Sequence, residues 1–555
     1  MMWRNLFFTA GLVLSALLAA CSNSGHGTTA VTIAISSNSG VHNKPGIGLR
    51  SKAMNPVTVV RITISGPGMD TMTKDIPVLS PQTVSQTFYV KNGPRRTFLI
   101  EALDASNAVI YRGSSTADLN GTPVTISLPL QTMLFNNLIT TPWNDEARTI
   151  AQAEDGNGDL IIAGHTFGDL GGPNADATHR TPDLFVSKLT PTGATIWKKQ
   201  FGTSAFDICY SAATDSMGNI YLTGSTGGDL NGTAKAGFID GYVMKLDPAG
   251  NVLWTSLTGT VLTNTFSNAI VVDNAGNAYL TGYTDGDLSD QRAGNAGMFD
   301  IFTAKYDPAG TLVWIRQDGS SGDDYGNGIA YSPGAAGPDA LYITGSTYGD
   351  LNGNTNADTV SPGSTTDFFL LKYDSAGNRQ WTYQSGTVDA SADDDALAVA
   401  VDPLSGGIYV AGGTTGALAS GLTGSADLFV AKFDAQGNAS WLQPQQRGAV
   451  GSSTIANAIA VYPNAGIVVT GTTDGNLDQL GNAGLRDLFM VEYDLNGYPG
   501  NLQQFGTKAD DDGTGIVIDN NGIITIVGNT YGGFTSSATE DIFLQQYTWV
   551  APLVP

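Results

Sequence analysis

One phrase recurs seven times between Asp183 and the C-terminus, and it constrains the fold of this chain more than any other feature. Each copy begins with Asp and has an aromatic residue two positions later. Most copies also have Lys five positions on and Gly ten positions on. The copies start at Asp183, Asp240, Asp300, Asp367, Asp427, Asp487 and Asp541. A spacing of about 60 residues predicts one supersecondary unit repeated in tandem, which buries its apolar faces against its neighbours.

Each repeat contains four strand-like segments. The first is rich in small residues, the second ends in a Gly-x-Thr step, the third is the Asp-led phrase, and the fourth holds Trp. The third segment is apolar on both faces, as in a sheet packed between two others, and small residues near an axis with Trp at a rim fit radial blades. The steps begin at Gly164, Gly224, Gly282, Gly345, Gly412, Gly471 and Gly528. Seven steps and seven phrases predict an all-β fold dominated by a seven-bladed β-propeller.

The way the ring closes is also readable. The last Asp-led segment ends near Tyr547 and leaves too little chain for a fourth strand. Leu134-Phe135 precedes Asp145 by ten residues, the offset at which Trp197 precedes Asp207. We therefore expect the segment around Leu134-Phe135 to complete the seventh blade. An open β-solenoid is the alternative, but it gives no reason for seven copies or for a displaced strand.

The repeats resemble the seven-bladed beta-propeller repeat family of bacterial surface and secreted proteins. The pattern Asp-x-Phe-x-x-Lys-Tyr-Asp-x-x-Gly followed by Trp is present from Asp300 to Trp314, and the pattern Asp-Asn-x-Gly-Asn-x-Tyr-x-x-Gly-x-Thr from Asp273 to Thr284. The resemblance covers roughly three quarters of the chain. The chain departs from the pattern at Asn501 in place of Trp, and at Glu492 and Gln546 in place of Lys. The resemblance implies a fold and a surface role, and no reaction.

The N-terminus predicts where the protein works. Arg4 and the apolar run from Leu6 to Leu17 are typical of a signal peptide and too short for a stable membrane anchor. The end of this run, Leu18-Ala19-Ala20-Cys21, resembles the lipobox of bacterial lipoproteins, which implies a signal peptide over residues 1–20 and lipid on Cys21. In that family Ser22 implies the outer membrane, on either of its sides. The alternative is an ordinary secretory signal with a chance Cys.

Three further segments follow the signal peptide. Residues 21–55 are rich in Ser, Gly, Asn and Thr, as in a flexible tether, with one alternating run from Val31 to Ile35 that could add a strand to the next domain. Residues 56–130 alternate in polarity and are interrupted by turn residues, which predicts a small antiparallel β-sandwich of the immunoglobulin-like or transthyretin-like kind. Residues 131–555 form the propeller.

Composition narrows the set of partners. The formal net charge of -24 argues against nucleic acid, because nucleic-acid binding needs clustered Lys and Arg. The sequence predicts the lipid at Cys21 as the only membrane anchor. Cys209 is the only other cysteine, and its strand-like surroundings predict a small core residue rather than a nucleophile.

Topology predicts which loops carry function. In a four-stranded meander, the loops between the second and third strands share one face with the links from blade to blade. This face is expected to be strongly negative and to bind the ligand. Its candidate residues are the loop acids Asp169, Asp229, Asp287 and Asp350 and the first-strand acids Asp207, Asp324, Asp394 and Asp511.

Calcium is the metal that such acids would suit, since it takes hard oxygen ligands. The loop face is one expected place for calcium, and the run Asp155-Gly156-Asn157-Gly158-Asp159 is another because Asp155, Asn157 and Asp159 alternate as oxygen donors. The run lacks the distal Glu of an EF-hand. An ordinary hairpin turn is the alternative interpretation of the run, and no cofactor is certain.

The sequence favours a non-catalytic binding or scaffolding module for an envelope protein or polysaccharide. Exposed aromatic residues in the loops would favour sugar, and a contiguous apolar patch would favour protein. The rings in question are Phe167, Phe238, Tyr348 and Tyr531. The rival is a carbohydrate- or peptide-active enzyme at the axis, using paired acids such as those at Asp393-Asp394-Asp395 or Asp510-Asp511-Asp512. His165 and His179 are the only histidines outside the tether, and His165 is expected at the surface or in packing.

Overall fold

The computed structural model has an all-β fold that divides into two compact units. Unit 1 contains residues 1–134 and 546–550, and unit 2 contains residues 135–545 and 551–555. No helix in the described part of the chain is long and apolar enough to cross a membrane. The structure describes residues 13–21, 28–38, 58–77, 84–103, 109–121, 127–129, 131–132, 139–288, 297–334, 339–357, 364–388, 391–419, 421–477, 482, 484–531 and 540–548.

Unit 1 consists of two antiparallel sheets. One has the strand order β5-β2-β1-β8 and the other β4-β3-β6-β7-β9. Their strands are β1 (Val13–Cys21), β2 (Thr28–Asn38), β3 (Val59–Ser65), β4 (Met72–Pro77), β5 (Val84–Lys91), β6 (Gly93–Leu103), β7 (Val109–Leu119), β8 (Ser127–Pro129) and β9 (Gln131–Thr132). Alternate residues of β3, namely Val60, Ile62 and Ile64, are buried, as period-two patterning requires.

Two strands of unit 1 lie in the part of the sequence predicted to be signal peptide and tether. β2 contains the alternating run from Val31 to Ile35, and it pairs with β5 of the same sheet, which confirms that this run adds a strand. β1 pairs with β2 from Val13 to Cys21 and so includes the end of the predicted signal peptide. This is the pairing of the uncleaved chain. Cleavage before Cys21 would remove all but the last residue of β1 from the sheet.

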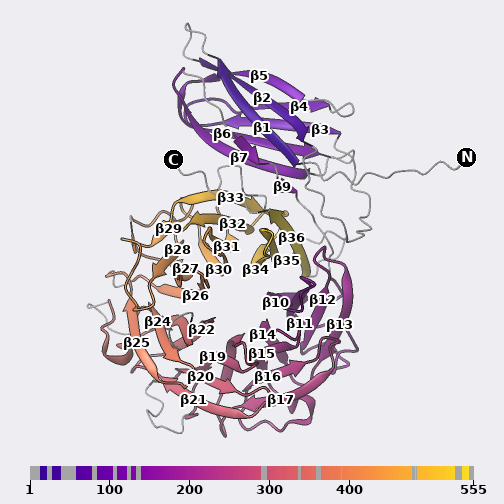
Figure 1. The fold of residues 1–555 in the computed structure, drawn as a ribbon, viewed down its shortest axis with the longest axis vertical. Coiled ribbons are helices and arrows are strands. Elements are labelled where there is room, and N and C mark those ends of the chain that lie inside the picture. The colour runs from indigo at the N-terminus through magenta and orange to yellow at the C-terminus, as the bar shows by residue number, and fades with distance from the viewer. Residues whose placement is uncertain are drawn as a thin grey trace, which may run out of the picture. The chain divides into compact units, whose positions relative to one another are not determined.

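Unit 2 consists of repeated antiparallel sheets that follow one another around a central axis (Figure 1). Its described residues form six four-stranded sheets and one three-stranded sheet, numbered here one to seven in chain order. In each sheet the strands are neighbours in the order of the sequence. The first strands lie innermost and are β10 (Asp145–Gln152), β14 (Asp207–Thr214), β18 (Thr265–Val272), β22 (Asp324–Ser332), β26 (Asp394–Val401), β30 (Thr454–Tyr462) and β34 (Asp511–Ile518).

The second and third strands are the Gly-x-Thr and Asp-led segments of the repeat. The second strands are β11 (Leu160–Thr166), β15 (Ile220–Thr226), β19 (Ala278–Thr284), β23 (Ala340–Thr347), β27 (Ile408–Thr414), β31 (Gly466–Thr473) and β35 (Ile523–Thr530). The third strands are β12 (Asp183–Leu189), β16 (Asp240–Leu246), β20 (Asp300–Tyr306), β24 (Asp367–Asp374), β28 (Asp427–Phe433), β32 (Asp487–Asp494) and β36 (Asp541–Thr548).

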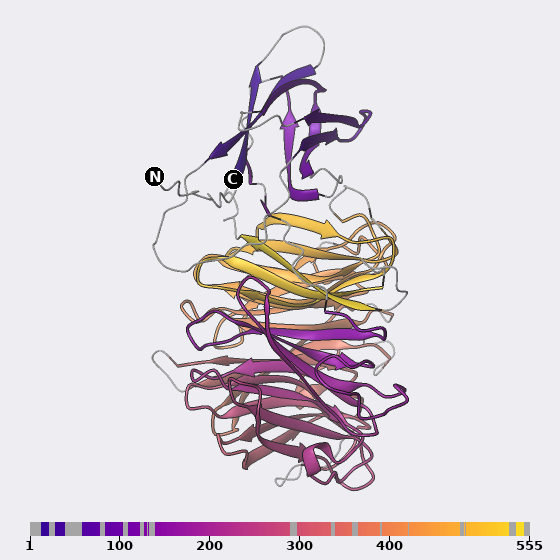
Figure 2. The ribbon, with the colours of Figure 1, turned by 90° about the vertical axis from the view of Figure 1, so that its right-hand side faces the viewer.

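The fourth strands lie outermost. They are β13 (Thr195–Phe201), β17 (Val252–Thr258), β21 (Leu312–Asp318), β25 (Arg379–Ser385), β29 (Gln445–Arg447) and β33 (Pro499–Phe505). Two short 3₁₀ helices, η1 (Leu230–Gly232) and η2 (Leu351–Gly353), lie in loops that connect second to third strands. Figure 2 shows unit 2 from the side, with the connecting loops at its two faces.

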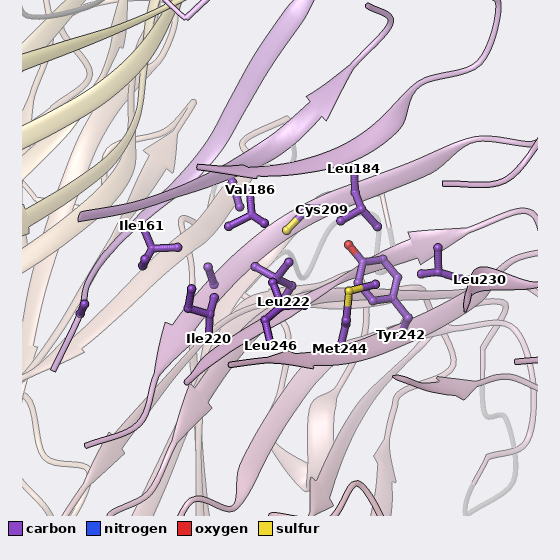
Figure 3. Close-up of a cluster of buried hydrophobic side chains, with 13 residues drawn as sticks. Ile161, Leu184, Val186, Cys209, Ile220, Leu222, Leu230, Tyr242, Met244 and Leu246 are labelled. Atoms are coloured by element: carbon purple, nitrogen blue, oxygen red, sulfur yellow. The ribbon is translucent and has the colours of Figure 1, made fainter. Parts of the chain in front are cut away.

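Hydrophobic cores form between consecutive sheets. One core joins Leu184 and Val186 of sheet one to Cys209, Leu222 and Met244 of sheet two (Figure 3). Burial raises the pKa of the Cys209 thiol to about 12, so the thiol stays protonated and unreactive. The prediction that Cys209 is a core residue is confirmed.

The Gly-x-Thr step has a structural cause. Every pair of first and second strands has a β-bulge at the same place, for example between Ala147 and Thr149. The Gly of the step lies directly over this bulge. A Cβ at Gly164 would lie 1.9 Å from the Glu146 carbonyl oxygen, and the other steps are as tight. Only glycine fits there.

The Lys, Trp and turn Gly of the repeat form a clasp between neighbouring sheets. In sheet four, Lys372 Nζ and Trp381 Nε1 donate to the same carbonyl, Ala435 O in the last turn of sheet five, at 2.8 and 3.3 Å. Gly437 of that turn has a left-handed backbone with φ +86°, and a Cβ at this position would lie 3.1 Å from the Trp381 ring. Sheets two, three and five make the same clasp. The repeat pattern is therefore a set of contacts between sheets.

The ring closes through the N-terminal end of unit 2. Ile139 pairs with Ile542 of β36, and each donates its N–H to the other's carbonyl, at 3.1 and 3.2 Å. In sheet one the equivalent pair is Leu184 and Phe201, in the third and fourth strands. Ile139 therefore has the register of a fourth strand of sheet seven. The expected closing residues Leu134-Phe135 lie outside the described residues.

Candidate functional site

The first-strand acids lie inside the loop face and are not available to a ligand. Asp207, Asp324, Asp394 and Asp511 are all buried. In the best-defined case, Asp207 Oδ2 accepts the backbone N–H of Thr203 at 2.6 Å, and Oδ1 accepts the hydroxyl of Thr226 from the Gly-x-Thr step. The other three carboxylates are held by the same kinds of donor. The expectation that these four acids form an exposed negative surface is wrong, because the repeat itself supplies their hydrogen-bond donors.

Burial changes the acidity of these side chains. It raises the pKa of Asp207, Asp324 and Asp394 to about 6, although the hydrogen bonds from their threonine neighbours oppose the shift. Burial also raises the pKa of Asp511. Each of these carboxyls lies at the start of a first strand and binds the segment that connects this strand to the preceding sheet, as Asp207 does with Thr203.

The loop acids are exposed, as expected. Asp169, Asp229, Asp287 and Asp350 all lie at the surface. Three of them also hold their own loops. Asp169 Oδ1 accepts the N–H of Asn174, five residues on, at 2.9 Å, and Asp229 and Asp350 each accept the N–H of the residue six positions on. These carboxylates are therefore fixed in position and partly open to a ligand.

The predicted calcium run is occupied by a lysine. Lys188 Nζ lies 2.9 Å from Asp155 Oδ2 and 3.3 Å from Asp159 Oδ2. Asp155 Oδ1 accepts the N–H of Asn157 at 3.0 Å, as in an Asx turn. The described residues contain no group of three or more His, Cys, Asp or Glu side chains arranged to hold a metal. Calcium at this run stays a prediction, and it would have to displace the ammonium.

A polar cavity of about 500 Å³ opens on the loop face. It lies among sheets six, seven and one, where their first strands begin and their second strands end. Its walls include the first strands β10, β30 and β34, which are innermost in the ring (Figure 1). The lining residues are Glu146, Arg148, Ser453, Ile455, Asn457, Thr472, Asp474, Arg486, Asp512, Thr514, Asn529, Tyr531 and Glu540.

The pKa values of two glutamates in the cavity, Glu146 and Glu540, are shifted in opposite directions. Burial and the neighbouring Glu146 carboxylate raise the pKa of Glu540. Burial also acts to raise the pKa of Glu146, but the hydrogen bond and charge of His165, with the charge of Arg148, outweigh it and lower the pKa. Arg148 Nη2 is 2.5 Å and His165 Nε2 3.6 Å from Glu146 Oε2. Glu540 therefore keeps a proton at a pH where an ordinary carboxyl has lost it.

The Glu540 carboxyl also has an unused oxygen. Glu540 is only 2% exposed, and its Oε2 has no hydrogen-bond partner among the described residues. Unpaired buried oxygens are rare in folded proteins because desolvation without a hydrogen bond is costly. His165 is buried as well, which supports its expected packing role and excludes a surface position.

Arg486, the second arginine of the cavity lining, is already paired. Arg486 Nε lies 2.9 Å from Asp510 Oδ1, and Arg486 Nη2 lies 3.5 Å from Asp512 Oδ2. Of the acid triplet at Asp510-Asp511-Asp512, Asp512 lines the cavity, and Asp511 is buried. The cavity thus contains both signs of charge, largely neutralised within its own walls.

An aromatic cluster lies on the loop-face ends of sheets three and four. Tyr283 is stacked on Phe266 at 4.9 Å between ring centroids, and Phe299 and Tyr325 meet it edge-on at 5.4 and 4.9 Å. All four rings are half-buried. Figure 1 shows β22 of sheet four across the ring from β10 of sheet one. The charged cavity and the aromatic cluster therefore lie on different sides of one loop face.

Exposed apolar side chains complete the loop face. They come from loops that connect second to third strands and from links between sheets, and they are Trp143, Phe238, Val261, Leu262, Met298, Val388, Leu422, Val450, Leu485 and Tyr531. Of the four rings named from the sequence, Phe238 and Tyr531 are exposed, and Phe167 and Tyr348 are half-buried. His179 is engaged with Trp143, whose ring it stacks on at 4.8 Å.

Sequence reasoning missed the glutamates of the cavity. Glu146 and Arg148 occupy the first-strand positions that hold Phe266 and Asn268 in sheet three, and Glu540 precedes Asp541 where Phe299 precedes Asp300. These positions vary among the repeats, whereas the repeat pattern is defined by the positions that stay the same. Aligning the repeats with one another and looking for charge at variable positions would have found them.

Comparison with known proteins agrees with the repeat pattern. Residues 196–231 and 253–289 match the family model described as Beta-propeller repeat. An uncharacterized WD repeat-containing protein of Acanthamoeba polyphaga mimivirus is 24% identical over 438 residues, which are 62% of this chain and 31% of the relative. This chain thus spans about a third of the length of that curated relative.

Solved structures with a similar arrangement include two enzymes. A gluconolactonase from Xanthomonas campestris is 14% identical, with a TM-score of 0.29, and the match covers 61% of this chain and 96% of the enzyme. An α-L-arabinofuranosidase of Fusarium graminearum is 11% identical, with a TM-score of 0.34, and the match covers 75% of this chain and 97% of the enzyme. The strands of the structure and the matched family model, and not these distant structures, make this chain an all-β protein that contains β-propeller repeats.

Proposed function

We propose that this chain is an outer-membrane lipoprotein whose propeller is a non-catalytic binding module for a partner in the cell envelope, either a polysaccharide or a protein. The observation that carries the proposal is the loop face of unit 2. This face gathers ten exposed apolar side chains, four exposed loop acids and the polar cavity on loops held by buried hydrogen bonds. Exposed apolar side chains grouped with polar ones on a rigid scaffold are typical of binding surfaces.

The anchor in this proposal is lipid on Cys21. Its support is the short apolar run that ends in Leu18-Ala19-Ala20-Cys21. Mass spectrometry of the N-terminal peptide and fractionation of the envelope test the anchor. We expect the wild-type protein in the outer membrane with an acylated first residue, and Cys21→Ala uncleaved or released. An unmodified Cys21 in a soluble wild-type protein would contradict the anchor.

We also propose that the seven sheets of unit 2 are the blades of one closed propeller. The pairing of Ile139 with Ile542, in fourth-strand register, supports this. Unit 1, with one sheet of four strands and one of five, fits the proposed immunoglobulin-like or transthyretin-like spacer.

A pull-down by the detergent-solubilised full-length protein tests the binding module, with envelope proteins and envelope polysaccharides offered separately, in calcium and in chelator. We expect capture that is lost in a variant with Asp229→Ala, Asp350→Ala and Phe238→Ser. The matched control changes exposed residues of the opposite face, Met217→Ser and Tyr498→Ala, and keeps capture. Equal capture by both variants would exclude the loop face.

The second candidate is a carbohydrate- or peptide-active enzyme at the axis. The observation that favours it is the pair Glu146 and Glu540, whose acidities are shifted in opposite directions as in an acid and a base. The same experiment separates the two. Release of cleaved glycan or peptide by the wild-type protein, lost in Glu146→Gln, would replace the binding module with the enzyme.

A further inference from the structure

We propose that the cavity among sheets six, seven and one binds one sugar residue of a neutral polysaccharide. This inference rests on the proposed function and names its ligand class. Three features of the cavity carry it: a polar lining with internally paired charges, an exposed ring at its rim, and an unsatisfied buried oxygen.

The lining suits hydroxyl groups. Thr472, Asn457 and Ser453 present alcohol and amide groups, and the cavity volume of about 500 Å³ is within the range of small-ligand sites. A sugar hydroxyl donates one hydrogen bond and accepts others, so it can meet donors and acceptors that alternate around one wall. Thr472 Oγ1 already donates to Asp512 Oδ1, and Asn457 Nδ2 donates to Gly513 O and to Thr472 Oγ1. The ligand would therefore use the acceptor capacity that these groups have left, which an apolar ligand could not do.

The charges of the lining favour a neutral sugar. Arg148 is paired with Glu146, and Arg486 with Asp510 and Asp512. A uronate or phosphate would have to compete with these carboxylates for the arginines, and it would meet Asp474 in the same cavity. A neutral polyol needs no change in these ion pairs, so its binding avoids the cost of exposing a charge that has lost its partner.

Glu540 gives the site its specificity. Its Oε2 lies buried without a hydrogen-bond partner among the described residues, in a side chain that lines the cavity. A ligand hydroxyl that reaches this oxygen would supply the missing donor. A site built around an unpaired buried acceptor rejects ligands that lack the matching donor.

Tyr531 supplies the stacking surface. Its ring lines the cavity and is 40% exposed, although it follows the buried end of β35. The apolar face of a pyranose packs on such a ring while the ring edge stays wet. The half-buried rings of Phe266, Tyr283 and Tyr325 offer further apolar contacts to a longer chain on the same loop face.

Isothermal titration of the detergent-solubilised full-length protein tests the site. The probes are cellohexaose, maltohexaose, laminarihexaose and chitohexaose, with hexagalacturonate as the acidic probe. We expect at least one neutral hexasaccharide to bind and the acidic probe not to bind. Tyr531→Ala should weaken binding at least about tenfold and Tyr531→Phe less than about threefold, because only the first removes the ring. Tyr498→Ala, an exposed tyrosine of the opposite face, should leave binding within about twofold.

A second variant separates ligand recognition from stability. Glu540→Leu should weaken binding at least about tenfold, while its melting temperature stays the same or rises, since the variant removes an unsatisfied buried oxygen. Four results would overturn the site: no neutral probe binds, the acidic probe binds better, Tyr531→Ala binds as wild type, or Glu540→Leu binds as wild type. Envelope capture that persists without any glycan binding would sink this inference and leave the proposed function standing. If the wild-type protein captured no envelope protein and no polysaccharide, the proposed function itself would be contradicted.

Discussion

Ile139 and Ile542 exchange two backbone hydrogen bonds across the closing edge of the ring, and both side chains are buried there. Ile139 therefore contributes a backbone pair and an apolar contact to the seam between sheets one and seven. The core at this seam also contains Leu160, Phe185 and Leu544. The pairing covers the outer edge of β36 at Ile542, which protects this edge from pairing with another chain.

Loss of the closing contact is expected to destabilise unit 2. Ile139→Ala should lower the free energy of unfolding by about 3 kcal/mol, as for other buried aliphatic truncations. Ile139→Pro should lower it further, since proline cannot donate to the Ile542 carbonyl. Unfolding followed by near-UV circular dichroism measures the change. Ile196→Ala, at an exposed outer-strand position, is the control and should change it by less than about 0.5 kcal/mol. Equal effects at the two positions would mean that the seam carries no stability.

The clasp between sheets predicts a second stability difference. Trp381→Ala should cost about 3–5 kcal/mol, because the ring packs on Gly437 and its Nε1 donates to Ala435. Gly437→Ala should also destabilise, since it combines a left-handed φ with a close contact to that ring. Leu442→Ala, at a fully exposed position one residue after the equivalent Trp441, is the control. Thermal melting of the three variants checks the order.

Buried acids predict an inverted pH dependence. The pKa of Asp324 is raised to about 6, so its contribution to stability is fully present below the unfolded value of 3.8 and is lost as pH rises through 6. Asp324→Asn should remove part of this fall, on the order of 1–3 kcal/mol between pH 4 and 7. The turn residue Asp434 has a lowered pKa, so Asp434→Asn should change the acid side of the profile instead. A profile of unfolding against pH that is the same for both variants would contradict the assignment.

Calcium offers a test of the run at Asp155. Because Lys188 already pairs with Asp155 and Asp159, we expect calcium to change the melting temperature of the wild type by less than about 1 °C relative to chelator. Lys188→Gln frees both carboxylates and should make melting calcium-dependent. A calcium shift in the wild type together with metal in the purified protein would show that the ion displaces the ammonium.

Repetition made the fold readable from the sequence. The Gly-x-Thr step and the Asp-led phrase recur in every sheet of unit 2, and the Trp recurs in the repeats of sheets one to five, so their spacing indicates strand order and number. The same repetition misled the site prediction. Asp207 and its equivalents look like surface acids because their hydrogen-bond donors, such as Thr226, lie in another strand and join them only in the fold. Glu540 lies in a position that no repeat rule describes.

The clasp also explains two departures from the repeat pattern. Sheet six would use the Lys and Trp positions, here Glu492 and Asn501, to grip the last turn of sheet seven. In sheet seven β36 pairs with Ile139, which comes before β10 in the sequence, so no hairpin turn joins the two. The acceptor is missing, so the donors are missing as well.

In each clasp the donors lie in one sheet and the acceptor lies in the next sheet along the chain. The clasps are therefore interrupted where the last sheet meets the first. A circularly permuted chain that opened the turn after β28 would leave Lys372 and Trp381 without their carbonyl acceptor at Ala435. In such a chain, we would expect Lys372 and Trp381 to be replaced by residues that need no acceptor in the next sheet. Glu492 and Asn501 are the residues at the same two positions of sheet six. The side chains of sheet six at Glu492 and Asn501 thus mark the position in the ring where β36 pairs with Ile139.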